Sequence, residues 1–410
     1  MVAGTIIGSG IFLLPSAIAM QIASLPAVLL VWVAGGVLTV FGALSLAELG
    51  AMYPGAGGLC TYLREAYGPL PAFLYAWGLL SMIHSGSIAA LAVAFSLFAG
   101  GGKALSALPI LALTAINCLG IRNGKLVQNL AAAAKLTGLA AMIVLMCLRG
   151  PLRAPIAATG PATSIAGYTI ALIAVLWAYE GWHVVSFVAG ELRAPQRDLP
   201  RALLIGTGLV MAIYLTATVG YYRVLTPQQI RGSDTVAALA MGTLIGPAGA
   251  TTISVLILVS LAGSLNGLIL SGPRVYYAMA REGLFPGAFG RVSERYGTPT
   301  FALVVQGLWT AALAISGSYQ QLFTDVVFTA WIFYGLAVAA VPLLRRRRPQ
   351  IERPFRVPGY PWASLLFCAA ALGLVAATFV QQPAGALTGI GLVACGVPVY
   401  AVARRRAARP

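Results

Sequence analysis

The sequence predicts an all-α polytopic membrane protein with 12 transmembrane helices. Of the 410 residues, 59% are apolar and 9% carry formal charge, whereas about 25% are charged in a typical soluble protein. A helix needs about 20 apolar residues to cross a bilayer, and the chain offers a dozen such stretches. Backbone groups in lipid must be hydrogen-bonded internally, and the alternating pattern of a membrane barrel is absent, so the stretches are predicted to be helices.

The positions of the basic residues predict the orientation of these spans. The predicted spans are 1–22, 27–52, 71–98, 104–121, 127–148, 165–190, 201–224, 247–280, 299–318, 321–344, 362–381 and 384–403. With the amino terminus inside, the inside loops hold nineteen Lys and Arg residues and the outside loops hold five. By the positive-inside rule both termini are therefore cytoplasmic, in a multi-pass protein of a bacterial plasma (inner) membrane. The net charge of +16 reflects contact with the lipid bilayer, and we expect no nucleic-acid partner.

Two of the predicted spans contain their own interruptions. The first span holds three glycines within seven residues, Gly4, Gly8 and Gly10, and the sixth places Glu180 next to a glycine at mid-span. The two places are five helices apart in order, and interrupted helices at matching positions of two halves are typical of an inverted-repeat transporter with a site near the bilayer midplane. Taken singly, either glycine cluster would be interpreted as close helix packing.

An interrupted helix offers hydrogen-bonding groups that suit a zwitterion. The half-helix after the first interruption exposes the N–H groups of Ser9, Gly10 and Ile11, which together with the Ser9 hydroxyl can hold a carboxylate. Carbonyl groups freed near Ile6 in the first span can accept hydrogen bonds from an ammonium group, and so can those near Trp177 and Glu180 in the sixth. This chemistry is generic for a small anionic or zwitterionic solute.

Several motifs resemble one family of transporters. The run Gly4-Thr-Ile-Ile-Gly-Ser-Gly-Ile-Phe12 resembles the first-helix signature of the amino acid–polyamine–organocation superfamily. Further motifs resemble its L-type amino acid transporter branch; they are Trp177 to Trp182, Glu191-Leu192, Asp198-Leu-Pro-Arg201, Pro54 to Gly58, Tyr62 to Gly68, Ser85 to Ala90, Gly272 to Tyr276, Ala278 to Arg281 and Pro354 to Pro361. The resemblance covers nearly the whole chain.

The resemblance implies a LeuT-like core and a set of roles. Ten core helices would form two inverted repeats, 1–148 and 165–344, followed by two peripheral helices within 362–403, and the core would work by alternating access around broken helices 1 and 6. It also implies that Ile6, Ser9 and Gly10 bind the substrate backbone and that Trp177 is the aromatic gate over bound substrate. A packed aromatic residue is the alternative interpretation of Trp177.

Lys135 lies about nine residues into an apolar span. A lysine there costs roughly 2.5–3.5 kcal/mol, so it needs a partner or a function. In the L-type branch the matching lysine occupies the position where sodium-coupled relatives hold an ion, between the broken first helix and the eighth helix. Ser264 and Asn266 are candidate partners on the eighth helix. The resemblance therefore predicts coupling through Lys135 and no use of sodium.

Glu180 and His183 depart from the branch, whose members usually carry Gly or Asp and Asn at these positions. The pair could be a proton relay, Glu180 could recognise a cationic side chain, or the two could form a structural hydrogen bond between helices. His84, in the third span, is more readily interpreted as a hydrogen-bonded contact between helices than as a pocket residue.

These observations predict a sodium-independent secondary transporter of α-amino acids, most simply neutral ones, that works as an exchanger, a facilitator or a proton-coupled carrier. An amino-acid sensor on a transporter fold and a carrier of cationic amino acids or polyamines are the alternatives. We expect no enzyme activity, cofactor or metal site, since two histidines and scattered cysteines make no ligand set. The outer loop Gly100 to Ala104 lacks the cysteine that links animal members of the family to a heavy chain, so no such partner is expected. Only seven residues precede Gly8, fewer than in members of the family that the chain resembles, so either the start is truncated or misassigned, or this version leaks or is inactive.

Overall fold

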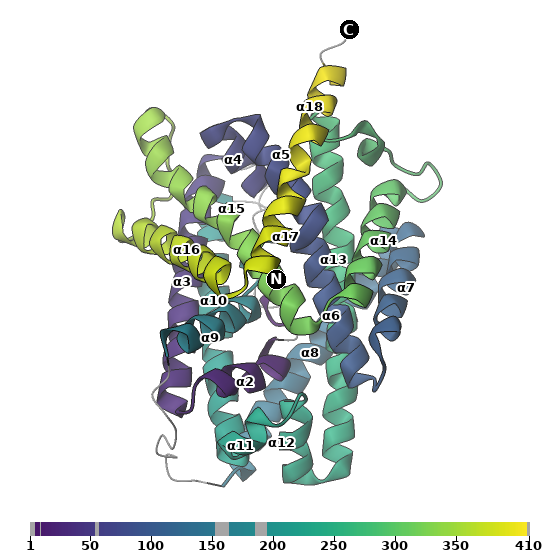
Figure 1. The fold of residues 1–410 in the computed structure, drawn as a ribbon, viewed down its shortest axis with the longest axis vertical. Helices are drawn as coiled ribbons and strands as arrows, with labels where there is room; N and C mark the ends of the chain where they lie inside the picture. The colour runs from purple at the N-terminus through teal and green to yellow at the C-terminus, as the bar shows by residue number, and fades with distance from the viewer. Residues whose placement is uncertain (1–4, 9, 54–56, 152–163, 185–194, 408–410) are drawn as a thin grey trace.

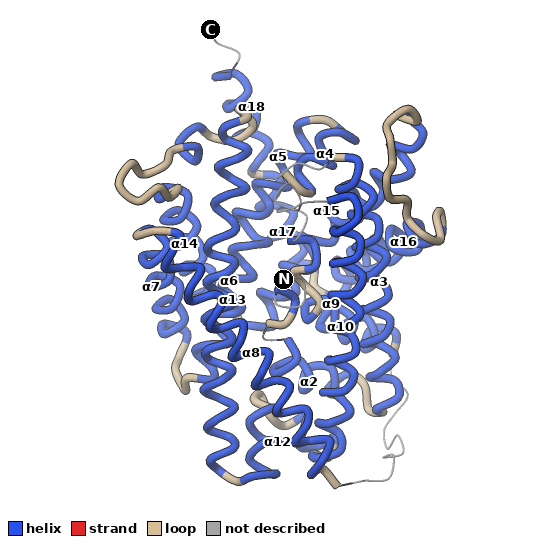
Figure 2. The backbone as a smooth tube through the Cα atoms, turned by 180° about the vertical axis from the view of Figure 1, so that it is seen from behind, coloured by secondary structure: helices blue, strands red, loops and turns tan. Residues whose placement is uncertain are grey.

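The computed structural model describes residues 5–8, 10–53, 57–151, 164–184 and 195–407, and the regular structure in these ranges is helical without any strand (Figure 2). The longest helices are α3 (Leu25–Met52), α8 (Ile121–Arg149), α10 (Pro195–Val224), α13 (Pro247–Arg281), α15 (Tyr319–Arg347) and α16 (Trp362–Gln381). The helices α5 (Pro69–Gly78) and α6 (His84–Phe98) are joined through a π-helical turn at Leu79–Ile83 into one continuous stretch. The shorter helices are α2 (Gly10–Gln21), α4 (Leu59–Tyr67), α7 (Ala107–Cys118), α9 (Ile165–Ala178), α11 (Pro227–Arg231), α12 (Val236–Ile245), α14 (Thr300–Ser316), α17 (Pro383–Ala394) and α18 (Gly396–Ala407).

Eight helical stretches in the described part of the chain are long and apolar enough to cross a membrane. They begin at Leu25, Pro69, Ile165, Arg197, Pro247, Tyr319, Trp362 and Pro383. Four shorter apolar helices, Gly10–Gln21, Lys103–Cys118, Val236–Ile245 and Thr300–Ser316, fall below that length. The segment between the predicted seventh and eighth spans contains α11 and α12 rather than a simple connection, and the last predicted span is divided at Cys395.

Helix starts follow from local sequence. Ser24, Ser164 and Ser318 each precede a helix and accept a hydrogen bond from the backbone N–H three residues later, at 3.4, 3.1 and 3.3 Å. A serine in this position satisfies one of the N–H groups that the first turn leaves without an intrahelical partner. Thr226 and Gln229 form a reciprocal capping box at the start of α11. These caps place the ends of the apolar helices where the sequence changes from polar to apolar.

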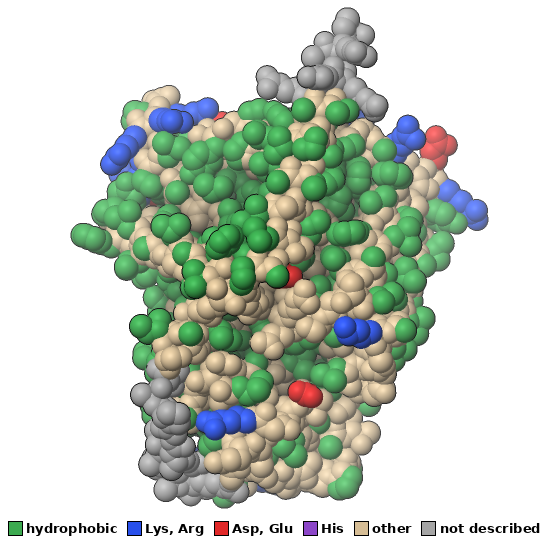
Figure 3. Space-filling view, viewed as in Figure 1, with side chains coloured by type: hydrophobic (Ala, Val, Ile, Leu, Met, Phe, Trp, Pro, Cys, Tyr) green, Lys and Arg blue, Asp and Glu red, His purple; other side chains and the backbone are tan. Residues whose placement is uncertain are grey.

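The helices α3 and α13 run along the vertical direction of the view, α15 crosses it diagonally, and the short helices α2 and α9 lie across the middle of the bundle (Figure 1). These two short helices contact each other, and α9 also contacts α3 and α15. At the upper end of the same view α4, the end of α13 and the end of α15 gather, and Lys and Arg side chains are concentrated at that end of the visible face (Figure 3). Apolar side chains are densest on the upper half of that face and are also scattered over the lower half, as expected for a surface in contact with lipid.

A buried carboxylate joins helices at the end of the bundle where Lys and Arg side chains are concentrated. Glu48, at the end of α3, is fully buried and accepts hydrogen bonds from Arg345 Nε at 2.8 Å and Nη2 at 2.6 Å. It also accepts a hydrogen bond from the backbone N–H of Val357 at 2.7 Å, and the Arg345 guanidinium lies 3.8 Å from the centre of the Tyr360 ring. Glu48 therefore joins α3 to α15 and holds the connection that leads into α16.

Candidate functional site

Both interruptions predicted from the sequence are present in the structure. Residues 5 and 6 are helical, Ile7 and Gly8 are not, and α2 begins at Gly10. Ser9, a predicted substrate-binding residue, lies outside the described residues. In the second segment α9 ends at Ala178, a turn follows, and Gly181 has φ +106°, a conformation that favours glycine.

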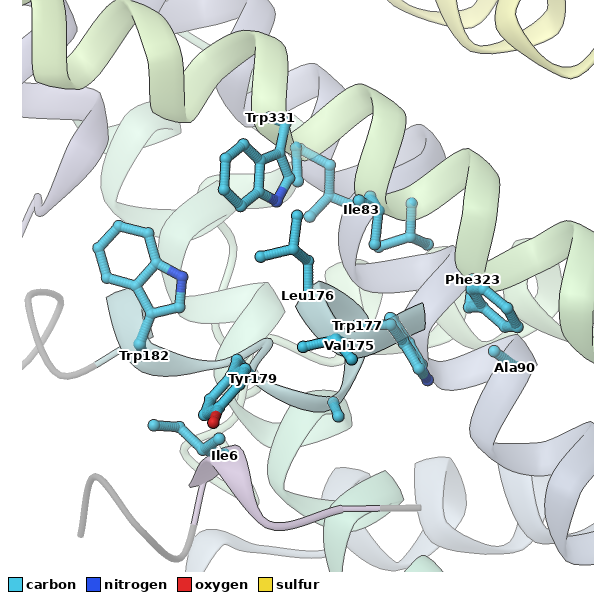
Figure 4. Packing of buried hydrophobic residues seen from close by; sticks show 14 of the residues in the cluster. Ile6, Ile83, Ala90, Val175, Leu176, Trp177, Tyr179, Trp182, Phe323 and Trp331 are labelled. Carbon is cyan, nitrogen blue, oxygen red and sulfur yellow. The ribbon is translucent and has the colours of Figure 1, made fainter. Parts of the chain in front are cut away.

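The two interruptions pack directly against each other. A Cβ atom added to Gly10 would lie 2.7 Å from both Cα and Cβ of Ala178, and one added to Gly181 would lie 2.9 Å from the carbonyl oxygen of Thr5. Contacts this short exclude any side chain at either glycine without backbone movement. Glycine at these positions is therefore what lets the ends of the two broken segments touch. Figure 4 shows Ile6 of the first segment beside Tyr179 of the second.

A tyrosine of α10 links carbonyl oxygens of both broken segments. The Tyr214 hydroxyl lies 3.3 Å from the oxygen of Ile6 and 3.0 Å from the oxygen of Ala178. Both oxygens lie where a helix stops, so the usual donor four residues later is missing. The single hydroxyl hydrogen is therefore shared between one carbonyl from each segment, which favours their observed relative position.

A second tyrosine of α10 compensates for a proline. Pro15 lies inside α2 and has no N–H, so the carbonyl oxygen of Ile11, four residues earlier, lacks its helical donor. The Tyr221 hydroxyl donates to this oxygen at 3.1 Å. Tyr221 and Tyr214 are seven residues apart, about two turns, and so lie on the same face of α10. This face of α10 follows the first broken segment along its length.

Lys135 reaches the first interruption from α8. Its side chain is 2% exposed, and its ammonium group donates to the carbonyl oxygen of Ile7 and to Ser264 Oγ, the latter at 3.4 Å. The lysine thus joins the broken first segment to α13. Asn266, the other predicted partner on α13, is buried, and its Oδ1 accepts a hydrogen bond at 2.8 Å from Asn117 of α7.

Trp177 lies at the end of α9 and is held by α15. Its indole N–H donates to the Tyr319 hydroxyl at 3.0 Å, and its ring stacks on Phe323 at 6.1 Å between centroids. Figure 4 shows the indole extending from α9 toward Phe323. The residue predicted to be a gate is therefore placed between the second interruption and the first turn of α15.

Glu180 and His183 meet at Tyr334 of α15. The Tyr334 hydroxyl donates to Glu180 Oε1 at 2.5 Å and lies 2.9 Å from His183 Nδ1. His183 Nδ1 is also 3.4 Å from Glu180 Oε1. When the Tyr334 hydroxyl donates to Glu180, its oxygen can accept a hydrogen bond from His183 only if Nδ1 carries a hydrogen. The hydrogen bonds would then run from His183 through Tyr334 to Glu180. The other oxygen of Glu180, Oε2, is buried and has no hydrogen-bond partner among the described residues.

His84 differs from the expectation of a hydrogen-bonded contact. It is 2% exposed, and neither ring nitrogen has a hydrogen-bond partner in the described part of the chain. A Cβ on Gly272 would lie 3.0 Å from His84 Nδ1 and 2.2 Å from Gln306 Oε1, so His84 faces α13 and α14.

The structure brings most of the predicted residues to the two interruptions and adds three tyrosines. Ile6, Gly10 and Ile11 lie at the first interruption, Trp177 and Glu180 at the second, and Lys135 with Ser264 beside the first. Sequence reasoning missed Tyr214, Tyr221 and Tyr334. An aromatic residue in an apolar span is common and does not by itself indicate a site. The one available signal was the seven-residue spacing of Tyr214 and Tyr221, which places both on one face of α10.

Known proteins with similar sequences are carriers of amino acids. A family model described as "Amino acid permease" matches residues 1–401. The chain is 32% identical over 419 residues to the serine/threonine exchanger SteT of Bacillus subtilis (strain 168), covering 100% of this chain and 95% of that protein. It is 34% identical over 374 residues to the b(0,+)-type amino acid transporter 1 of Homo sapiens, covering 87% and 77% of the two chains. It is 31% identical over 418 residues to the human cystine/glutamate transporter, covering 98% and 82%.

Proposed function

Because this chain belongs to the amino acid permease family of the amino acid–polyamine–organocation superfamily, we propose that it exchanges neutral α-amino acids across a bacterial plasma membrane without sodium. The proposal includes 12 spans, inverted repeats at 1–148 and 165–344, peripheral helices within 362–403, and cytoplasmic termini. The similarity to a serine/threonine exchanger supports both exchange and a neutral substrate. The lack of a disulfide-linked heavy chain is part of the same proposal.

The observation that carries the proposal is the contact between the two interrupted segments. Gly10 packs on Ala178, and the Tyr214 hydroxyl serves carbonyl oxygens of both segments. The first N–H groups of α2, at Gly10 and Ile11, have no intrahelical partner and lie at the positive end of a helix. We propose that they bind the substrate carboxylate together with Ser9, and that carbonyl groups near Ile6, Trp177 and Glu180 bind the ammonium. Trp177 would cover the bound amino acid.

The proposed absence of sodium coupling is supported by the position of Lys135. Its ammonium group is a cation bound to a carbonyl of the broken segment and to Ser264 of α13. A tethered cation at that point already supplies the positive charge that a bound ion would bring. Asn266 lies two residues beyond Ser264 on α13. It would support this arrangement through its hydrogen bond with Asn117.

Counterflow in proteoliposomes tests the proposal. Vesicles preloaded with unlabelled serine should accumulate labelled serine at equal rates in sodium and in choline buffers, and vesicles without internal amino acid should accumulate much less. A tenfold stimulation by sodium would refute the role of Lys135. Binding of amino acids without any flux would instead identify a sensor built on a transporter fold. Faster counterflow of lysine or a polyamine than of serine would identify a carrier of cationic substrates.

Coupling to protons is a second candidate, and the arrangement around Glu180 favours it. Tyr334 contacts both Glu180 and His183 through hydrogen bonds, and Glu180 Oε2 has no protein partner among the described residues. If a proton moves with the substrate, an imposed pH gradient should drive uphill uptake, and Glu180→Gln should abolish that drive while leaving counterflow. Uptake that ignores the gradient would leave Glu180 as a structural link between the end of α9 and α15.

A further inference from the structure

An open groove outside the proposed transport site combines two arginines with an apolar wall. It is lined by Arg197, Pro200, Arg201, Leu204, Pro354 and Phe355. The first four residues belong to the start of α10, and the last two belong to the connection between α15 and α16. The lining contains two positive charges and no acidic side chain; Asp198 lies in the same turn of α10 but does not line the groove.

The two arginines sit at the end of an apolar span. The helical stretch Arg197–Val224 is long and apolar enough to cross a membrane, so its first turn lies at headgroup depth if it does so. Arg197 and Arg201 are four residues apart and so lie on one face, with side chains exposed. Two guanidinium groups at this spacing can hold one phosphate group between them.

Exposed apolar side chains continue the same face of α10 toward the bilayer interior. Leu204 is 37% exposed, Ile205 69% and Leu209 52%. Leu199 and Leu203, on the opposite face, are buried. A molecule bound in the groove therefore meets positive charge at one end and an apolar surface directly below it, which matches the headgroup and acyl chains of an anionic phospholipid.

The opposite wall of the groove is held in place by hydrogen bonds that are buried or partly buried. Arg353 donates to the carbonyl oxygens of Leu344 and Arg348, each at 3.0 Å, and the Val357 N–H donates to buried Glu48 at 2.7 Å. These contacts lie on either side of Pro354 and Phe355, so the connection cannot fold away without breaking them. The groove is thus preformed, which lowers the entropic cost of binding.

We infer that this groove binds one anionic phospholipid, with the phosphate between Arg197 and Arg201 and an acyl chain along Leu204. Since each basic residue near an anionic headgroup contributes roughly 1 kcal/mol, loss of both arginines should weaken binding about 30-fold. The inference concerns a lipid contact and does not depend on which solute the protein carries.

Native mass spectrometry of the full chain in detergent tests the inference. Phosphatidylglycerol should remain bound to the unaltered chain, phosphatidylcholine with the same acyl chains should bind much more weakly, and soluble glycerol phosphate should neither bind nor compete. The double variant Arg197→Gln/Arg201→Gln should lose most of the bound phosphatidylglycerol. The matched control Arg291→Gln/Arg295→Gln removes two exposed arginines from another connection and should retain it.

Three results would overturn the inference. Unchanged retention in the Arg197/Arg201 variant would show that the groove does not hold the headgroup, and equal loss in both double variants would show a general charge effect. Competition by glycerol phosphate at the same concentration would identify a site for a soluble anion. Because both arginines are exposed, misfolding is not expected, and Arg197→Lys/Arg201→Lys, which keeps both charges, should retain most of the binding.

Discussion

Replacement of Tyr214 by Phe removes one oxygen atom and leaves the ring in place. That oxygen is the shared donor to the carbonyl groups of Ile6 and Ala178, one from each interrupted segment. A buried acceptor left without a partner costs about 1–3 kcal/mol. If the relative position of the two segments builds the substrate site, this energy appears as weaker binding, roughly 5-fold to 150-fold in Kd.

Tyr221→Phe is the matched control for this substitution. Tyr221 lies on the same helix and donates to the carbonyl oxygen of Ile11, which belongs to α2 alone. Both variants should lose a similar amount of thermal stability, since each leaves a buried carbonyl unsatisfied. Equilibrium binding of labelled serine to purified protein should weaken strongly only in Tyr214→Phe. Unchanged affinity in that variant, or equal losses in both, would refute the idea that the contact between the two interruptions forms the site.

Three further predictions follow from other contacts. Lys135→Met removes the donor to Ile7 and Ser264. Counterflow should therefore fall at least tenfold, while the folded fraction in size-exclusion chromatography changes little. Normal flux in this variant would show that Lys135 has only a structural role. Gly10→Leu cannot fit against Ala178, because even an added Cβ would lie 2.7 Å from it, so serine binding should be lost. The control variant Gly208→Leu should bind serine normally, because no atom lies within 4 Å of an added Cβ at that position. Glu48→Gln leaves Arg345 without its buried carboxylate. The loss should lower the free energy of unfolding by about 3–5 kcal/mol and lower the melting temperature in detergent. An unchanged melting temperature would show that water replaces the carboxylate.

The sequence predicted those parts of the structure that depend on local pattern. Apolar runs gave the helices, and glycines grouped with Ser9 and Glu180 indicated the two interruptions, because a glycine cluster near a polar residue is unfavourable for a continuous membrane helix. The contact of Lys135 with Ser264 also matches the expectation, which came from the family resemblance and from the cost of a lysine in lipid.

The groups that surround the interruptions could not be predicted in the same way. Tyr214 and Tyr334 act at the site through hydroxyl groups that reach carbonyl or carboxylate oxygens of segments far away in the sequence. No local pattern reports such long-range pairs. The anchoring of Glu48 by Arg345 is of the same kind, since the partners are separated by 297 positions. The short helices α11 and α12 were also missed, although the capping box of Thr226 and Gln229 is a local signal for the start of α11.

The helix α15 contacts the bundle at three heights along its axis. Tyr319 receives the Trp177 indole, Tyr334 binds Glu180, and Arg345 binds Glu48. From the first to the last of these residues the helix rises roughly 39 Å. Sliding or rotating the helix would break polar contacts at all three heights simultaneously. These contacts therefore favour an α15 that keeps its position relative to the bundle. Any displacement of the second broken segment during a transport cycle would then have to break its hydrogen bonds to Tyr319 and Tyr334 of α15.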